Sequence, residues 1–191
     1  MNRLLSRVAV LALVALGSMA VLAEQPANIP QQLSTLADQP ATHLSFSFDR
    51  SMLDSASAFL DGSGSPVGNA TAQLHSITVD TYHYPHAAFY TPEAMNGIIA
   101  TYHAAGWKHL VDAHTTPAMS AQPNHSITDL WLHFNGMEID DVTVLTRGAR
   151  DMNLIQISCA LRPLDLLHLS GHFGIPKVDP NAVMVPAPDG R

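Results

Sequence analysis

Cysteine is almost missing from this chain of 191 residues, because Cys159 is the only one. A single cysteine excludes an intramolecular disulfide framework, so the fold has to be held by apolar packing. Cys159 lies in the apolar run LIQISCAL and is expected to be a small buried hydrophobic residue rather than a reactive thiol.

Basic residues are also scarce, with nine Lys and Arg against 16 Asp and Glu and a formal charge of −7. Such a charge argues against nucleic acid and anionic lipid as partners. Long apolar runs are missing after residue 23, and nothing there approaches the ~18 apolar residues of a membrane-spanning helix. We therefore expect no transmembrane segment in the mature chain.

Catalytic signatures are missing as well. The sequence has no G-x-S-x-G elbow, no H-E-x-x-H helix, no P-loop and no dinucleotide fingerprint. Asp140 and Asp141 are adjacent carboxylates, but neighbours on a strand point to opposite faces, which favours a solvated turn over an acid/base pair. We expect a protein that is not an enzyme, with no catalytic residues and no cofactor.

The apolar run that is present lies at the start of the chain. Residues 1–23 combine Arg3 and Arg7, an apolar stretch from Val8 to Leu16 and a small residue at Ala23, which together predict a secretory signal peptide. Cleavage near Ala23 would remove two basic residues, leaving seven against 16 acidic residues and a formal charge of −9. The protein is expected to be exported, either periplasmic or secreted.

The remaining chain is expected to form one domain at residues 42–176. Residues 24–41 are polar and contain proline, so they predict a flexible lead-in. The proline-rich residues 177–191 predict a disordered tail.

The stretch from Leu74 to Ala113 is the clearest structural unit. Ile77 and Val79 alternate with polar residues, which predicts a strand with one buried face. Thr91 and Pro92 mark the start of a helix that ends at Gly106, and a second strand follows from Trp107.

Alternation predicts the other strands. Leu44, Phe46 and Phe48 indicate a half-buried strand before a helix at 51–60, and Asn135-Gly136 indicates a hairpin within a meander of three late strands. A last helix begins at Pro163. The order β-α-β-α-β-β-β-β-α predicts an α+β two-layer sandwich, with a mostly antiparallel sheet of about six strands and the helices on one face.

Several segments resemble the bacterial exported domain of unknown function family DUF 4252. They are the early helix LDSASAFLDG, the strand LHSITVDTYHY, the G-W-K turn at 106–108, the strand DMNLIQISCAL and the late GHFGIP. The resemblance covers roughly residues 43–176. It implies a small exported or lipid-anchored bacterial protein, and no site residue or ligand. This chain differs from the family in being rich in histidine and in lacking a lipid-attachment cysteine.

Eleven histidines make metal binding the alternative function, since imidazole is a common ligand of transition metals. The densest cluster holds His83 and His86. Residues three apart on a strand face opposite ways, so both rings would reach one ion only if Pro85 turned the chain.

A surface is the other candidate site. If helices cover the face that carries Leu130 and Leu132, then Tyr82, Tyr84, Trp131 and His133 share the open face, and exposed aromatics are typical of interfaces. The lead-in, the tail or a second subunit could instead cover these residues, and a homodimer fits both alternatives. We expect an exported, non-catalytic domain that binds a protein or cell-envelope partner, with a metal or small-ligand carrier as the alternative.

Overall fold

The computed structural model describes residue 26 and residues 29–57, 66–111, 117–172, 175 and 177. The strands within these ranges are β1 Thr42–Phe48, β2 Leu74–His83, β3 Lys108–Val111, β4 Ile127–Asn135, β5 Glu138–Arg147 and β6 Asp151–Leu161. The helices are α1 Ile29–Ser34, α2 Arg50–Ser57, α3 Pro66–Thr71, α4 Pro92–Ala104, α5 Pro117–Ala121 and α6 Pro163–His168. The expected signal peptide and the expected tail beyond residue 177 lie outside the described residues.

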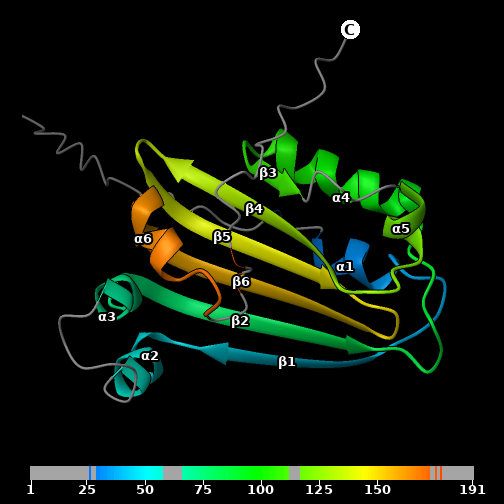
Figure 1. Cartoon of the computed structure of the whole chain (residues 1–191), viewed down its shortest axis with the longest axis horizontal. Coiled ribbons are helices and arrows are strands. Elements are labelled where there is room, and N and C mark those ends of the chain that lie inside the picture. The colour runs from blue at the N-terminus through cyan, green and yellow to red at the C-terminus, as the bar shows by residue number, and fades with distance from the viewer. Residues whose placement is uncertain are drawn as a thin grey trace, which may run out of the picture.

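The six strands form one antiparallel sheet in the order β1-β2-β6-β5-β4-β3, as Figure 1 shows. This confirms the expected α+β fold and its six-stranded sheet. The chain turns between Asn135 and Glu138 at Gly136, whose φ of 66° lies in the left-handed region. The predicted hairpin and the meander β4-β5-β6 are therefore present.

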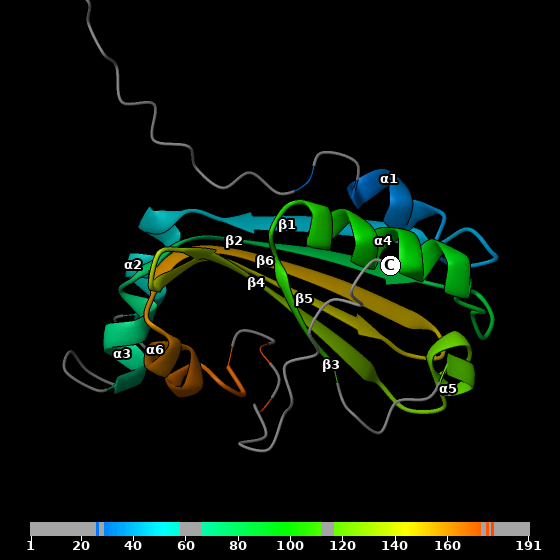
Figure 2. The ribbon, with the colours of Figure 1, turned by 90° about the horizontal axis from the view of Figure 1, so that it is seen from above.

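Helices cover both faces of the sheet, which corrects the expectation of a single covered face. One apolar cluster joins α1 and α4 to Trp131 and Leu145, and we call this side the α4 face. The other cluster joins α2, α3 and α6 to Leu130, Leu132 and Val144, and we call this side the α6 face. Figure 2 shows α4 and α1 on one side of the sheet and α3 and α6 on the other.

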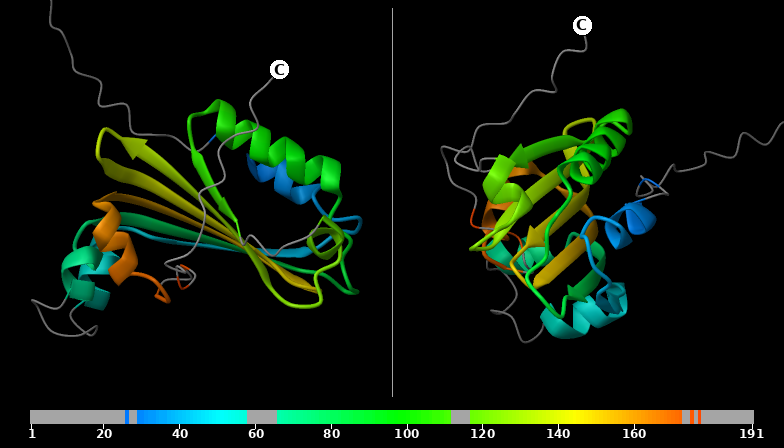
Figure 3. Two further views of the ribbon diagram at one scale, coloured as in Figure 1. Left: turned by 45° about the horizontal axis from the view of Figure 1, so that its top comes forward. Right: turned by 90° about the vertical axis from the view of Figure 1, so that its right-hand side faces the viewer.

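Both faces need cover because the central strands are apolar at both alternating positions. On β5, Val142 and Val144 point to the α6 face while Leu145 points to the α4 face, and each is fully buried. The two sets of helices lie at opposite ends of the strands (Figure 3). Each face therefore keeps one end without a described helix above it.

The end of the predicted lead-in is part of the core, which corrects its description as flexible. Leu33 and Leu36 are buried in the cluster with α4, and Ala37 forms a β-bridge with Tyr90. Thr91 N–H donates to the Leu36 carbonyl at 2.9 Å. The segment after residue 29 thus closes the α4 face.

Strand β1 is more exposed than predicted. Every residue of β1 is exposed, with Leu44 at 56%, Phe46 at 55% and Phe48 at 40%. The alternation predicted a buried side, but β1 is the terminal strand of the sheet and the described helices do not cover these side chains.

Among the described helices, none is long and apolar enough to cross a membrane.

Candidate metal centre

Three of the four residues expected on an open face are part of the core. Tyr82, Tyr84 and Trp131 do lie on one face as the alternation predicted, but they are only 7%, 2% and 1% exposed. They pack in the cluster that contains α1 and α4, so the covering segment is partly the predicted lead-in. His133 is the exception, because its side chain keeps 24% of its surface exposed.

Aromatic rings fill the space between α4 and the sheet. Trp131 stacks between Tyr102 and His109, with ring centroids 4.7 Å and 4.6 Å away. Trp107 contacts the edge of Tyr102 and lies 5.3 Å from the His133 ring. This cluster explains the burial of the face and forms the inner wall beside His133.

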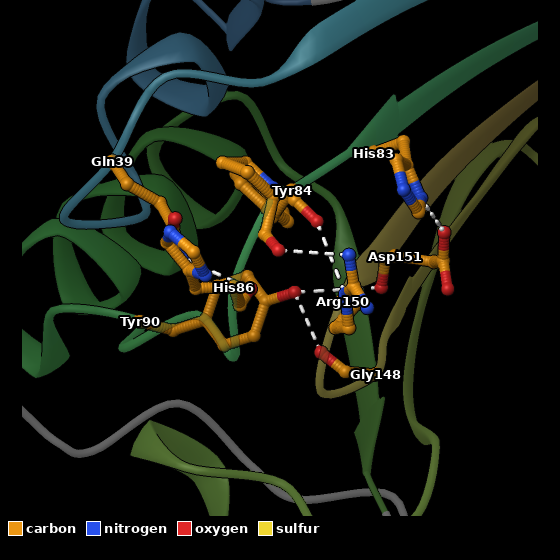
Figure 4. Close-up of polar contacts among 9 residues, drawn as sticks. Gln39, His83, Tyr84, His86, Tyr90, Gly148, Arg150 and Asp151 are labelled. Carbon is orange, nitrogen blue, oxygen red and sulfur yellow. Dashed lines mark hydrogen bonds and ion pairs between the residues drawn. The ribbon is translucent and has the colours of Figure 1, made fainter.

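The two histidines of the predicted metal site do not meet. His83 Nδ1 lies 2.7 Å from Asp151 Oδ1, whereas His86 is exposed and its carbonyl accepts a hydrogen bond from Gln39. Figure 4 shows the two imidazoles well apart, pointing in different directions. The prediction that Pro85 could bring both rings to one ion is therefore not met by this geometry.

The turn after β2 is instead fixed by backbone contacts. Arg150 donates to the carbonyls of Tyr84 and Pro85, at 3.3 Å and 2.8 Å, and Tyr84 N–H donates to the Arg150 carbonyl. The Tyr90 hydroxyl donates to the Gly148 carbonyl at 2.8 Å. These contacts connect the turn after β2 to the β5–β6 turn, so the turn after β2 has a structural role.

A different group brings three metal-ligating side chains together. His133 on β4 and Asp140 and Asp141 on β5 each offer a ligand atom, and these atoms lie within 4.8 Å of one another. His133 Nδ1 lies 2.7 Å from Asp140 Oδ1 in a hydrogen bond in which the ring nitrogen donates, since a carboxylate oxygen only accepts. The group lies near the β4–β5 hairpin, on the α4 face.

A β-bulge makes this grouping possible. His133 pairs with Asp141 and Phe134 pairs with Ile139, so Asp140 is an extra residue on β5. The bulge interrupts the alternation that would send the two carboxylates to opposite faces. This corrects the expectation that Asp140 and Asp141 point apart.

Asp141 is the buried member of the group. It is 5% exposed, and none of the described residues donates a hydrogen bond to its carboxylate. Burial and the nearby Asp140 charge raise the pKa of Asp141 to about 7, while His133 opposes this rise. A buried carboxylate without a donor is costly, and a cation would offset that cost.

The ligand types fit one divalent transition metal. Zinc takes imidazole nitrogen and carboxylate oxygen at ~2.0–2.2 Å, which places ligands ~3.4 Å apart in a tetrahedron. Small side-chain rotations would bring the three atoms to that spacing, since His133 and Asp140 are partly exposed. Two carboxylates and one neutral imidazole carry two negative charges, which balance one divalent ion, and a fourth position would remain for water.

Other histidine–carboxylate pairs bridge neighbouring strands but offer fewer ligands. His43 pairs with Asp80 at 2.9 Å, and His109 pairs with Asp129 at 3.1 Å. Asp129 also forms an ion pair with Arg147 at 2.9 Å, so a protein cation already neutralises its carboxylate. Within the described part of the chain, only the group at His133 reaches three ligands.

Comparisons of this chain with protein-family models, with curated proteins and with solved structures found no match. The resemblance to DUF 4252 therefore stays a prediction. The function has to be argued from the geometry of the chain itself.

Proposed function

We propose that this protein binds a divalent transition-metal cation, with Zn²⁺ as the best fit, through His133, Asp140 and Asp141. The observation that carries the proposal is the Asp141 carboxylate, whose residue is only 5% exposed, which accepts no hydrogen bond from the described residues and which lies beside a second carboxylate and an imidazole. A bound cation would neutralise both carboxylates and take the place of the proton that His133 Nδ1 donates to Asp140.

The ligand set also favours zinc over the hard cations. Mg²⁺ and Ca²⁺ prefer six or more oxygen ligands, whereas this group offers one nitrogen and two carboxylates. The partial exposure of His133 and Asp140 leaves an approach for the ion from solvent. The aromatic wall at Trp107 limits access from the side of α4.

We propose a binding role rather than catalysis, and an exported location if the predicted signal peptide is used. The alternative function expected from the histidine content, a metal carrier, is thereby retained at different residues. The role expected for Tyr82, Tyr84 and Trp131 as a partner surface is not proposed, because these side chains are buried.

The test is a Zn²⁺ titration of the purified chain, stripped of metal with a chelator, by calorimetry and by competition with a chromogenic chelator. One Zn²⁺ should bind per chain, and millimolar Mg²⁺ should not displace it. His133→Ala, Asp140→Asn and Asp141→Asn should each weaken Zn²⁺ binding by at least ~100-fold, because each removes a ligand.

A matched control comes from the pair His83 and Asp151, which has the same 2.7 Å separation but no third ligand. His83→Ala and Asp151→Asn should leave the Zn²⁺ affinity within about twofold. Circular dichroism shows whether each variant is folded. A parent protein that binds no Zn²⁺, or folded His133 and Asp141 variants that bind it as the parent does, would refute the metal-binding function.

A further inference from the structure

The outer edge of β1 is the surface that the metal centre does not explain. Figure 1 shows β1 as the outermost strand of the sheet, next to β2. Leu44, Phe46 and Phe48 form a row on the α6 face, and all three are at least 40% exposed. Three large apolar side chains in a row on an edge strand indicate a surface that another chain covers.

This edge also lacks the features that keep edge strands apart. The seven residues of β1 contain no Lys, Arg, Asp, Glu or Pro, and they pair with β2 without a register shift. The opposite edge strand, β3, is protected in the usual ways, because it has only four residues and starts with Lys108. The contrast shows that β1 is suited to pairing with a further strand.

The helix that follows β1 is anchored to β2 by its first residue. Arg50 at the start of α2 donates to the carbonyls of Ala72 and Leu74, the latter at 2.7 Å, and also pairs with Asp54. These contacts hold the first turn of α2 against the start of β2. No described residue outside β2 makes a backbone hydrogen bond to β1.

We propose that two copies of this chain associate by antiparallel pairing of their β1 strands across a twofold axis at Phe46. In this register Phe46 lies opposite the partner's Phe46, and Leu44 lies opposite the partner's Phe48. Ser45 then faces the partner's Ser47. The pairing joins six apolar side chains into one row on the α6 face and continues the sheet to twelve strands.

The polar side chains at the two ends of β1 favour a second copy of the chain as the partner. The same register places His43, whose Nε2 also lies 2.9 Å from Asp80 Oδ1 of its own chain, opposite the partner's Asp49, twice across the axis. Asp49 accepts hydrogen bonds from the Ser51 hydroxyl and the Met52 N–H, which hold the pKa of Asp49 below its usual value and keep it ionised. A strand whose apolar row is complementary to itself, with a histidine opposite a carboxylate at each end, fits an isologous dimer.

The first test is sedimentation velocity of the purified chain over a range of concentrations, with EDTA present so that metal plays no part. The parent should be a dimer. Phe46→Lys should be monomeric, with a dimer dissociation constant at least ~100-fold higher, because two ammonium groups would meet at the axis. Leu164→Lys is the matched control, since Leu164 is 69% exposed on α6, and it should stay dimeric.

The register is tested by cysteine cross-linking. Directly paired residues of antiparallel strands have Cα atoms ~4.5–5.5 Å apart, which a disulfide can bridge. Phe46→Cys should therefore form a disulfide-linked dimer on mild oxidation, whereas Phe48→Cys should not, because Phe48 lies opposite the partner's Leu44. Cys159 is buried and does not interfere.

Several results would overturn the proposal. A parent that stays monomeric at every concentration would leave β1 as a site for a different protein. A dimer that persists in Phe46→Lys would place the interface elsewhere. A Phe48→Cys variant that cross-links while Phe46→Cys does not would reject the axis at Phe46.

Discussion

The side chain of Asp141 carries a cost in stability that the proposed metal site would offset. Its carboxylate is buried without a hydrogen-bond donor among the described residues, and its pKa is raised to about 7 by burial and by Asp140. The ionised form is therefore less stable in the native state than in the unfolded chain, where the pKa is ~3.9. In a binding site this cost is offset when a cation arrives.

The first prediction concerns Asp141→Asn without metal. Between pH ~4 and pH ~7 the native parent binds more protons than the unfolded chain, so its free energy of unfolding falls as the pH rises. The amide cannot ionise, so the variant should lack this fall and be more stable than the parent by ~2–4 kcal/mol at pH 8. Urea unfolding at several pH values, with EDTA present, measures the difference.

The control for this effect is Asp151→Asn, because the side chain of Asp151 is 59% exposed and the variant keeps Asp141. Its free energy of unfolding should fall between pH ~4 and pH ~7 as that of the parent does. An Asp141→Asn variant that is less stable than the parent at pH 8 would show that the Asp141 carboxylate has a favourable partner in the native state.

Single residues were predicted from the sequence with uneven success. Cys159 is buried, so the prediction of a small buried hydrophobic residue is confirmed, and burial raises the pKa of its thiol to about 12. Tyr82 and Trp131 were placed on the correct face but were expected to be exposed. Alternation gives the direction of a side chain, whereas exposure depends on what packs above it.

At the level of elements, the strands and the last helix, α6, were predictable, and three other short helices were not. Helices α1, α3 and α5 have six, six and five residues. Such lengths give less than two turns, so their apolar residues form no recognisable period, and none of the three helices was predicted. Tertiary packing rather than local sequence stabilises them.

The second prediction tests whether α1 belongs to the core. Leu33 is 1% exposed, so Leu33→Ala should lower the free energy of unfolding by ~2–5 kcal/mol through the lost contacts and the cavity. Gln31→Ala, at an exposed position of the same helix, is the control and should change it by less than ~0.5 kcal/mol. Equal stability of the two variants in chemical denaturation would restore the description of this segment as a flexible lead-in.

The β-bulge at Asp140 is the element that creates the proposed site. Its two residues face His133, and neither residue type is diagnostic of a bulge, so the sequence alone predicted a regular strand. The hairpin at Asn135-Gly136 was predicted because those residues favour a specific local turn. A bulge, by contrast, is defined by the pairing of two strands.

The whole molecule combines two surfaces that should act independently. The proposed metal centre lies on β4 and β5, whereas the proposed dimer edge is β1, and strands β2 and β6 separate them. Zn²⁺ at 100 times its dissociation constant should stabilise the native protein by ~2.7 kcal/mol and raise its melting temperature.

This shift should be as large in Phe46→Lys as in the parent and should be lost in Asp141→Asn. Thermal unfolding at a fixed protein concentration, with and without Zn²⁺, measures it. A shift that disappears in Phe46→Lys would mean that the second copy contributes to the metal centre.

The sequence by itself determined the strands, the hairpin and the α+β class, because alternation and turn residues act within a few positions of each other. Only the tertiary structure decided which faces are covered, that β1 ends the sheet, and that Asp140 and Asp141 both meet His133. These features depend on contacts between residues far apart in the chain. The same side chains would pack or be exposed according to which strand lies beside them and which helix lies above.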